Sequence, residues 1–188
     1  MLAQQPTVLI LASGRGERFK ASGGQGSKLE AQLQSKTVLQ HTLDAVRASG
    51  LPYHLESGLH LGMGDSIAAA VRATQEAAGW LILPGDLPLI QPDTLWAVAR
   101  ALAFHAVVLP VFEGQRGHPV GFSGACRDDL MRLKGNQGAA PVVLAYAAIK
   151  LVVSDAGTVI DIDTLDDLNL VAKLLALKTT LGFGAQCA

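Results

Sequence analysis

A glycine-rich, cationic segment near the N-terminus, residues 13–28 (SGRGERFKASGGQGSK), carries the residue types that bind polyphosphates. Its first glycines, Gly14 and Gly16, let backbone N–H groups approach phosphate oxygens closely. Its basic side chains supply the positive charge that a triphosphate requires, and those expected to contribute are Arg15, Arg18 and Lys28. The segment therefore predicts a nucleotide-binding loop, which begins with Leu11, Ala12 and Ser13.

The spacing in this loop excludes two common phosphate-binding motifs. A Walker A loop ends in Gly-Lys-Ser/Thr, whereas Lys28 is followed by Leu29. A dinucleotide fingerprint needs a third glycine where Phe19 stands, and the sequence offers no acidic residue on a second strand to hold a ribose, which disfavours a nicotinamide-dependent oxidoreductase. Two plainer interpretations stay open: the glycine turn is only a connector, and Lys28 is an ordinary solvated lysine.

Acidic residues follow two of the predicted strands and could bind a hard cation. Asp86 stands in the turn Pro84-Gly85-Asp86 after a buried strand, where a carboxylate can meet a cation on phosphate oxygens. Asp163 is the favoured second ligand, with Asp161 as the alternative, because both face the same side of an extended segment. The competing interpretations are an Asx turn for Asp86 and a helix cap for Asp163.

Strands and helices alternate along the chain in the order needed to gather these loops at one sheet edge. Apolar runs predict buried strands, and stripes with helical spacing predict the helices between them. The expected strands are Thr7–Ala12, Tyr53–Glu56, Trp80–Leu83, Ala106–Phe112, Val120–Ser123, Ile149–Val153 and Val159–Ile162. The expected helices are Thr37–Ser49, Asp65–Ala78, one beginning at Pro92, Gly124–Leu133, Ala139–Ala147 and Thr164–Leu177, whereas glycines should keep residues 13–28 irregular. This pattern predicts an α/β fold with an open, mostly parallel sheet and a ligand crevice at the strand ends.

Six ordered motifs make the chain similar to a known family. They are LASGRGERF with the later SKLEAQL, GMGDS at 62–66, LPGDLPL at 83–89, RGHPVGF at 116–122, GNQGA at 135–139 and DIDTLDDL at 161–168. The set resembles the MobA-like NTP transferases, most closely the molybdenum cofactor cytidylyltransferase branch. The resemblance implies a Rossmann-like three-layer nucleotidyltransferase fold. It also implies Mg²⁺-dependent transfer of NMP from an NTP to a phosphorylated small molecule, with release of pyrophosphate.

The resemblance assigns roles to individual residues. Lys28 would hold the phosphates, Arg18 would assist the leaving pyrophosphate, and Asp86 would complete the catalytic set. Nucleotide binding would involve Leu11, Ala12, Ser13, Gly14, Arg15, Gly16, Lys28, Gly64, Ser66, Pro84 and Gly85, and the metal would be held by Asp86 with Asp163 or Asp161. Arg116, His118 or the N–H groups near Gly138 would hold the acceptor, although His118 beside Pro119 could simply brace a hairpin.

The chain departs from the family pattern between Gly50 and Gly62. A strand, a helix and a further strand cannot fit there, so one βα unit is expected to be missing. The shortened sheet would expose an edge that a second copy could cover, giving a homodimer. Ser13 stands where the family has Ala, which goes with cytidine, or Gly, which goes with guanine, and the chain is nearer the cytidine branch, so CTP is favoured over GTP. The resemblance implies molybdopterin or the molybdenum cofactor as acceptor. The alternative is a non-catalytic nucleotide-binding accessory protein that works with a molybdoenzyme or its maturation partner.

Composition limits the remaining possibilities. The 188 residues are 49% hydrophobic and 16% charged, with a net charge of −1, so they provide no field for nucleic acid and every apolar run is too short to span a membrane. The two cysteines match no metal or disulfide spacing, which favours the cytoplasm. We expect one domain over residues 1–178, followed by a tail at 179–188.

Overall fold

The apolar run near the N-terminus forms β1 (Thr7–Leu11), the strand around which the fold is built. The computed structural model describes residues 5–14 and 16–182. All five residues of β1 are buried, and they alternate between two cores. Val8 and Ile10 pack in one hydrophobic cluster, and Leu9 and Leu11 pack in another. A strand without polar alternation is therefore covered on both faces, as predicted.

Seven strands of the described chain form the main sheet, in the order β4-β1-β5-β8-β6-β7, with β9 beside β6. β1 pairs in parallel with β4 and β5, and β6 pairs in parallel with β9, whereas β8 lies antiparallel between β5 and β6. Besides β1, the bounds are β4 (Tyr53–Glu56), β5 (Gly79–Pro84), β6 (Val107–Phe112), β7 (Gln115–Arg116), β8 (Val120–Ser123) and β9 (Ile149–Val152). A separate ribbon pairs β2 (Gln32–Leu33) with β3 (Lys36–Thr37).

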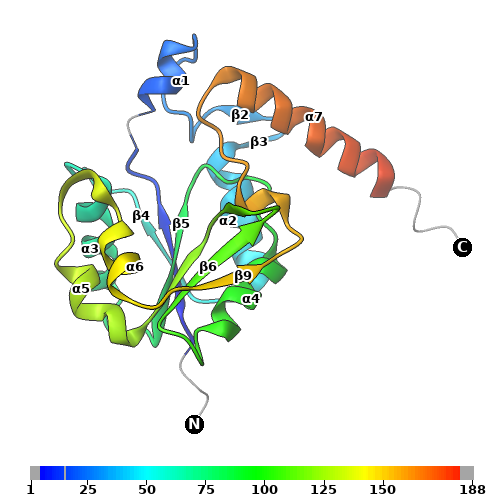
Figure 1. Cartoon of the computed structure of the whole chain (residues 1–188). Coiled ribbons are helices and arrows are strands. Elements are labelled where there is room, and N and C mark those ends of the chain that lie inside the picture. Colours follow the sequence, from blue (N-terminus) through cyan, green and yellow to red (C-terminus); the bar gives the residue numbers. More distant parts are fainter. Residues whose placement is uncertain (1–4, 15, 183–188) are drawn as a thin grey trace, which may run out of the picture.

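Helices cover both faces of the sheet and give three layers (Figure 1). α2 and α4 pack on one face, and α3, α5 and α6 pack on the other. The helices are α1 (Glu17–Ala21), α2 (Val38–Ser49), α3 (Met63–Ala73), α4 (Pro92–Ala101), α5 (Arg127–Met131), α6 (Ala140–Ala145) and α7 (Leu165–Gly182), with short 3₁₀ turns at η1 (Gly124–Cys126), η2 (Gly135–Gln137) and η3 (Ala156–Thr158). None of the described helices is long and apolar enough to cross a lipid bilayer.

A third core lies beyond the carboxyl ends of the parallel strands, where α1, the β2–β3 ribbon and α7 come together (Figure 1). Phe19, Leu33 and Ile162 are almost fully buried in it. The cluster fixes the N-terminal loop and the segment before α7 against the same edge of the sheet. These are the two regions that carry the predicted phosphate-binding and acidic residues.

The predicted fold class is confirmed, with corrections at several element bounds. Residues 13–28 were expected to be irregular, but α1 forms there because Gly16 adopts a left-handed conformation and Phe19 is anchored in the third core. The strand expected at 159–162 is absent, because the backbone N–H of Ile162 donates to the Asp86 carbonyl outside any ladder. α3 begins and ends earlier than expected, and α7 continues to Gly182.

The segment between Gly50 and Gly62 contains a single strand, β4, at its predicted position. β4 forms one edge of the described sheet, and α3 then leads directly from the loop after it to β5. As a result, the end of β4 lies beside the end of β1, with Leu11 opposite Glu56.

Candidate active site

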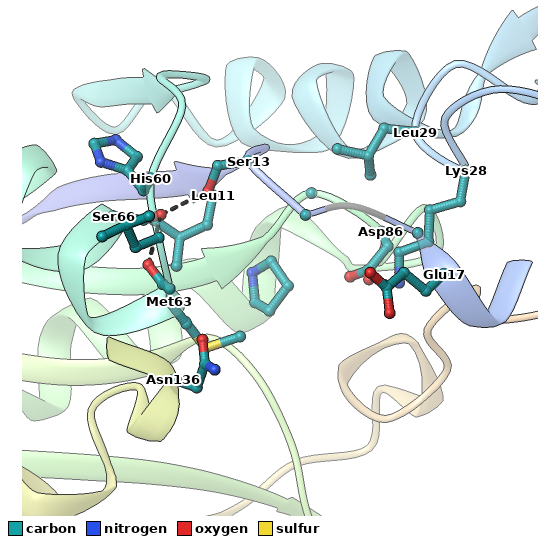
Figure 2. A pocket seen from close by; sticks show the side chains of 16 residues that line it. Leu11, Ser13, Glu17, Lys28, Leu29, His60, Met63, Ser66, Asp86 and Asn136 are labelled. Carbon is teal, nitrogen blue, oxygen red and sulfur yellow. Dashed lines mark hydrogen bonds and ion pairs between the residues drawn. The ribbon is translucent and has the colours of Figure 1, made fainter. Parts of the chain in front are cut away.

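A pocket of about 570 Å³ opens at the carboxyl ends of β1 and β5. The glycine loop after β1, the loop before α3 and the turn after β5 form its walls. The predicted site residues that line it are Leu11, Ser13, Gly14, Gly16, Lys28, Ser66, Pro84, Gly85 and Asp86. In Figure 2, Lys28 and Asp86 lie at one end of this pocket, and His60, Ser66 and Asn136 lie at the other.

Lys28 joins the two acidic segments at the charged end of the pocket. Its Nζ lies 2.6 Å from Asp86 Oδ2 and 2.6 Å from Asp163 Oδ1. Burial alone would lower the pKa of Lys28, but the charge of Asp86 and the hydrogen bond to Asp163 outweigh it, so the pKa is raised. Arg18 reaches the same cluster, with Nη1 2.5 Å from Asp163 Oδ2, from a largely exposed position on α1. The ammonium is therefore held charged between two carboxylates.

Asp161 completes a group of three acids with Asp86 and Asp163. One carboxylate oxygen from each lies within 4.8 Å of the others. Burial, followed by repulsion from Asp86 and Asp163, raises the pKa of Asp161. Asp86 Oδ1 is buried and has no hydrogen-bond partner among the described residues. Oxygen donors are the ligands that Mg²⁺ prefers, so three convergent carboxylates with one unpartnered buried oxygen fit this cation.

The structure contradicts the two competing interpretations, a helix cap for Asp163 and an Asx turn for Asp86. The cap at the start of α7 is made by Thr164 and Asp167, because Asp167 Oδ2 accepts hydrogen bonds from Thr164 N and Oγ1 while Thr164 Oγ1 accepts from Asp167 N. The Asp163 carboxylate faces Lys28 and Arg18 instead. An Asx turn at Asp86 would need a hydrogen bond to a local backbone N–H, whereas Oδ1 has no partner and Oδ2 faces Lys28.

The glycine loop is shaped by two tight contacts with its neighbours. Gly16 has a φ of 61°, a left-handed conformation that favours glycine and turns the chain into α1. Gly85 N donates to the Leu11 carbonyl at 2.9 Å, which closes the turn after β5 against the end of β1. Ser13 Oγ and Ser66 Oγ are 2.6 Å apart and tie this loop to α3.

Three of the predicted nucleotide-binding residues lie elsewhere or cannot be placed. Gly64 is buried and is not among the residues that line the pocket, and an added Cβ would lie 2.8 Å from the Lys134 carbonyl oxygen. Its role is to let α3 approach the loop before η2, where Asp65 also accepts a hydrogen bond from Gly135 N rather than capping α3. Ala12 packs against the third core. Arg15 falls outside the described residues.

Sequence reasoning missed the end of the pocket that lies opposite the acids. His60, Leu61 and Asn136 line it, although the histidine was expected to be an ordinary surface or core residue. Glu56 Oε1 accepts from His60 Nε2 at 3.0 Å and from Gly58 N at 2.9 Å. Burial alone would raise the pKa of Glu56, but these hydrogen bonds outweigh it and lower the pKa. The expectation that no acidic residue lies on a second strand was wrong, because Glu56 is the last residue of β4, a strand parallel to β1. Its position was the signal that could have identified this region.

An open, mostly parallel sheet with a glycine loop, a half-buried lysine and an acidic cluster at its carboxyl edge defines an α/β protein with a nucleotidyltransferase fold. The family model for the MobA-like NTP transferase domain matches residues 8–149, and the chain belongs to this family. This confirms the family that the six motifs predicted.

Several characterised proteins resemble the chain over most of its length. The purine catabolism protein PucB of Bacillus subtilis strain 168 is 29% identical over 199 residues, which cover 89% of this chain and 96% of PucB. Rv0371c of Mycobacterium tuberculosis H37Rv superposes with a TM-score of 0.77 at 24% identity, covering 92% of this chain and all of Rv0371c, and it has also been crystallised with manganese. The molybdopterin-guanine dinucleotide biosynthesis protein A of Archaeoglobus fulgidus superposes with a TM-score of 0.65 at 16% identity, covering 90% and 98% of the two chains.

Proposed function

We propose that the protein transfers a nucleoside monophosphate from an NTP to a phosphorylated small molecule and releases pyrophosphate. The observation that carries this proposal is the convergence of Lys28, Asp86 and Asp163 at one end of the pocket behind the glycine loop. In-line displacement at phosphorus depends on positioning and charge neutralisation rather than on a protein nucleophile. The pocket supplies both, and family membership supports the same reaction class.

The two ends of the pocket would bind different parts of the nucleotide. Gly14 and Gly16 lie where backbone N–H groups can meet phosphate oxygens, and Ser13 and Ser66 lie toward the end that would receive the nucleoside. Pro84 and Gly85 form the floor between these ends. Lys28 would turn from the acids to the phosphates when the nucleotide enters, and Arg18 would approach the departing pyrophosphate from α1.

Mg²⁺ is the cation that we propose for the acidic cluster. Asp86 and Asp163 would hold it, with Asp161 as the alternative to Asp163. When bound, the cation would neutralise charge on the phosphate oxygens. The crystallisation of Rv0371c with manganese supports a divalent cation in this fold.

The acceptor and the base are the finer parts of the proposal. CTP is favoured over GTP, and molybdopterin or the molybdenum cofactor is the proposed acceptor. The name of the Archaeoglobus neighbour, which refers to molybdopterin-guanine dinucleotide biosynthesis, supports the acceptor and keeps GTP as the alternative, whereas CTP is favoured by the sequence motifs alone. Action in the cytoplasm, a single domain and a dimer that covers the β4 edge also belong to this proposal.

Pyrophosphate release tests the proposal directly. The full chain is incubated with Mg²⁺, molybdopterin and labelled CTP, GTP or ATP, beside the variants Asp86→Ala and Asp44→Ala. Asp44 is exposed on α2 and pairs with Lys36, so its loss should leave turnover unchanged. Asp86→Ala should reduce turnover by about a hundredfold or more. If wild-type protein releases no more pyrophosphate than Asp86→Ala yet binds CTP in calorimetry, the non-catalytic accessory role replaces the enzyme.

A further inference from the structure

His118 lies beside the acidic cluster on a loop that the structure holds firmly. The loop joins β7 to β8, and His118 N donates to the Thr158 carbonyl at 2.9 Å. Its neighbour Gly117 packs so closely that an added Cβ would lie 2.6 Å from the same carbonyl oxygen. The residues after Thr158 lead to Asp161 and Asp163, so this contact fixes His118 relative to the acids.

The His118 ring leaves one nitrogen buried without a partner. Nδ1 has no hydrogen-bond partner among the described residues. Val120, two residues after His118, pairs with Ile82 in the antiparallel ladder between β8 and β5. Ile82 is a residue of β5, the strand that ends at the turn carrying Asp86. His118 therefore lies near the end of β5, beside the turn that carries Asp86. Burial lowers the pKa of His118, and the charges of Asp86 and Asp161 act in the opposite direction. A firmly held imidazole with an unpartnered polar atom thus lies near the acidic cluster.

Asp86 Oδ1, on the turn near His118, is also buried without a hydrogen bond among the described residues. A neutral imidazole protonated on Nε2 presents a lone pair on Nδ1, and a carboxylate oxygen offers only lone pairs. Two such acceptors cannot satisfy each other, and leaving buried acceptors unsatisfied is unfavourable. What both lack is a hydrogen-bond donor or a cation. Hydrated divalent cations provide both, because Mg²⁺ usually keeps several of its waters.

We propose that His118 is a positioning residue of the cation site, with Nδ1 accepting a hydrogen bond from the hydration shell of a divalent cation that the acids hold. The inference rests on the cation site of the proposed function and adds a neutral side chain to it. Side chains that hydrogen-bond to the surroundings of a metal in this way commonly change its affinity by 10- to 100-fold. His118 is not among the residues that line the pocket, so this role does not require contact with the nucleotide.

Manganese binding to the full chain tests the inference without turnover or nucleotide. The loss of the free Mn²⁺ signal in electron paramagnetic resonance gives the dissociation constant for wild type and for His118→Ala, His118→Phe and His118→Asn. Alanine and phenylalanine remove the acceptor, and asparagine keeps an oxygen at the same number of bonds from the backbone. We expect about tenfold weaker binding or more for the first two and a change below about threefold for asparagine. His105→Ala, at an exposed position before β6, is the matched control and should bind like wild type.

The outcomes separate this inference from the proposed function. The inference is overturned if folded His118→Ala binds Mn²⁺ with wild-type affinity. It is also overturned if His118→Ala binds Mn²⁺ more tightly, because the ring would then have acted as a competing positive charge. Equal weakening in His118→Asn and His118→Phe also overturns it, since ring volume would then matter rather than the acceptor. Direct coupling of a histidine nitrogen to the bound Mn²⁺ would replace it with a ligand role. If His118→Ala does not fold, the phenylalanine variant gives the same comparison. Unchanged binding in Asp86→Asn would instead show that the cation site itself is elsewhere.

Discussion

Replacing Lys28 by methionine tests whether the ammonium is the counterion that holds the acidic cluster together. Lys28 Nζ lies 2.6 Å from Asp86 and 2.6 Å from Asp163, and the three side chains are 13%, 14% and 23% exposed. Removing one partner of a buried ion pair costs about 3–5 kcal/mol, and the remaining exposure places this site near the lower end. We expect the free energy of unfolding, measured by urea titration in EDTA, to fall by about 3 kcal/mol.

A divalent cation should restore most of that loss, because it can neutralise the acids in place of the ammonium. At about one hundred times its dissociation constant, a ligand that binds only the folded state adds about 2.7 kcal/mol. The control is Lys36→Met, which breaks an ion pair of similar length, 2.5 Å, between side chains that are 49% and 41% exposed. Its loss should stay below about 1 kcal/mol with or without manganese. A loss as small as this in Lys28→Met, or a larger loss that manganese does not reverse, would refute the reasoning.

Three further measurements address other parts of the molecule. Hydrogen bonds hold the pKa of Glu56 below 4.5, so its carboxylate stabilises the fold above that pH and loses this contribution as the pH falls. In Glu56→Gln, the free energy of unfolding from urea titration should therefore decrease less between about pH 6 and about pH 3 than it does in wild type. Burial raises the pKa of the Cys126 thiol to about 11, so in a Cys187→Ser background iodoacetamide at about pH 8 should label it only after unfolding. Gly62→Ala would place a Cβ 2.3 Å from the Gly135 carbonyl; we expect about 1–3 kcal/mol lower stability in urea and weaker CTP binding in calorimetry.

The sheet was predictable because the residues of each strand indicate a strand on their own, without distant contacts. β1 is apolar over residues 8–11 and β5 over residues 80–83, and β4 fills the short interval between two glycine-bearing turns at its predicted residues. The elements that the sequence did not predict are held by distant contacts. α1 depends on the burial of Phe19 against residues from the far end of the chain, and Ile162 is fixed by a hydrogen bond to Asp86 rather than by a strand partner.

The site was predictable where parallel strands end and unpredictable where loops fold over them. Lys28, Asp86 and Asp163 were expected to share one cleft, and the structure brings them into direct contact although Lys28 and Asp163 are 135 residues apart. No pattern in the sequence indicated how the shortened region after β4 would fold. For that reason His60, held by Glu56, was not expected at the pocket wall.

The charge balance of the cluster bears on how a nucleotide would enter. Three carboxylates lie within 4.8 Å of one another, and the raised pKa of Asp161, caused by burial and then by Asp86 and Asp163, reflects their repulsion. Lys28 and Arg18 offset that repulsion, but the acids still outnumber these two cations. A polyphosphate approaching such a cluster alone would meet net negative charge and would also have to draw Lys28 away from its partners. In the proposed function, a nucleotide accompanied by a divalent cation would avoid both costs, because the carboxylates would hold the cation and Lys28 would be available to the phosphates. The ion pairs of Lys28 would therefore favour entry of the nucleotide together with its cation.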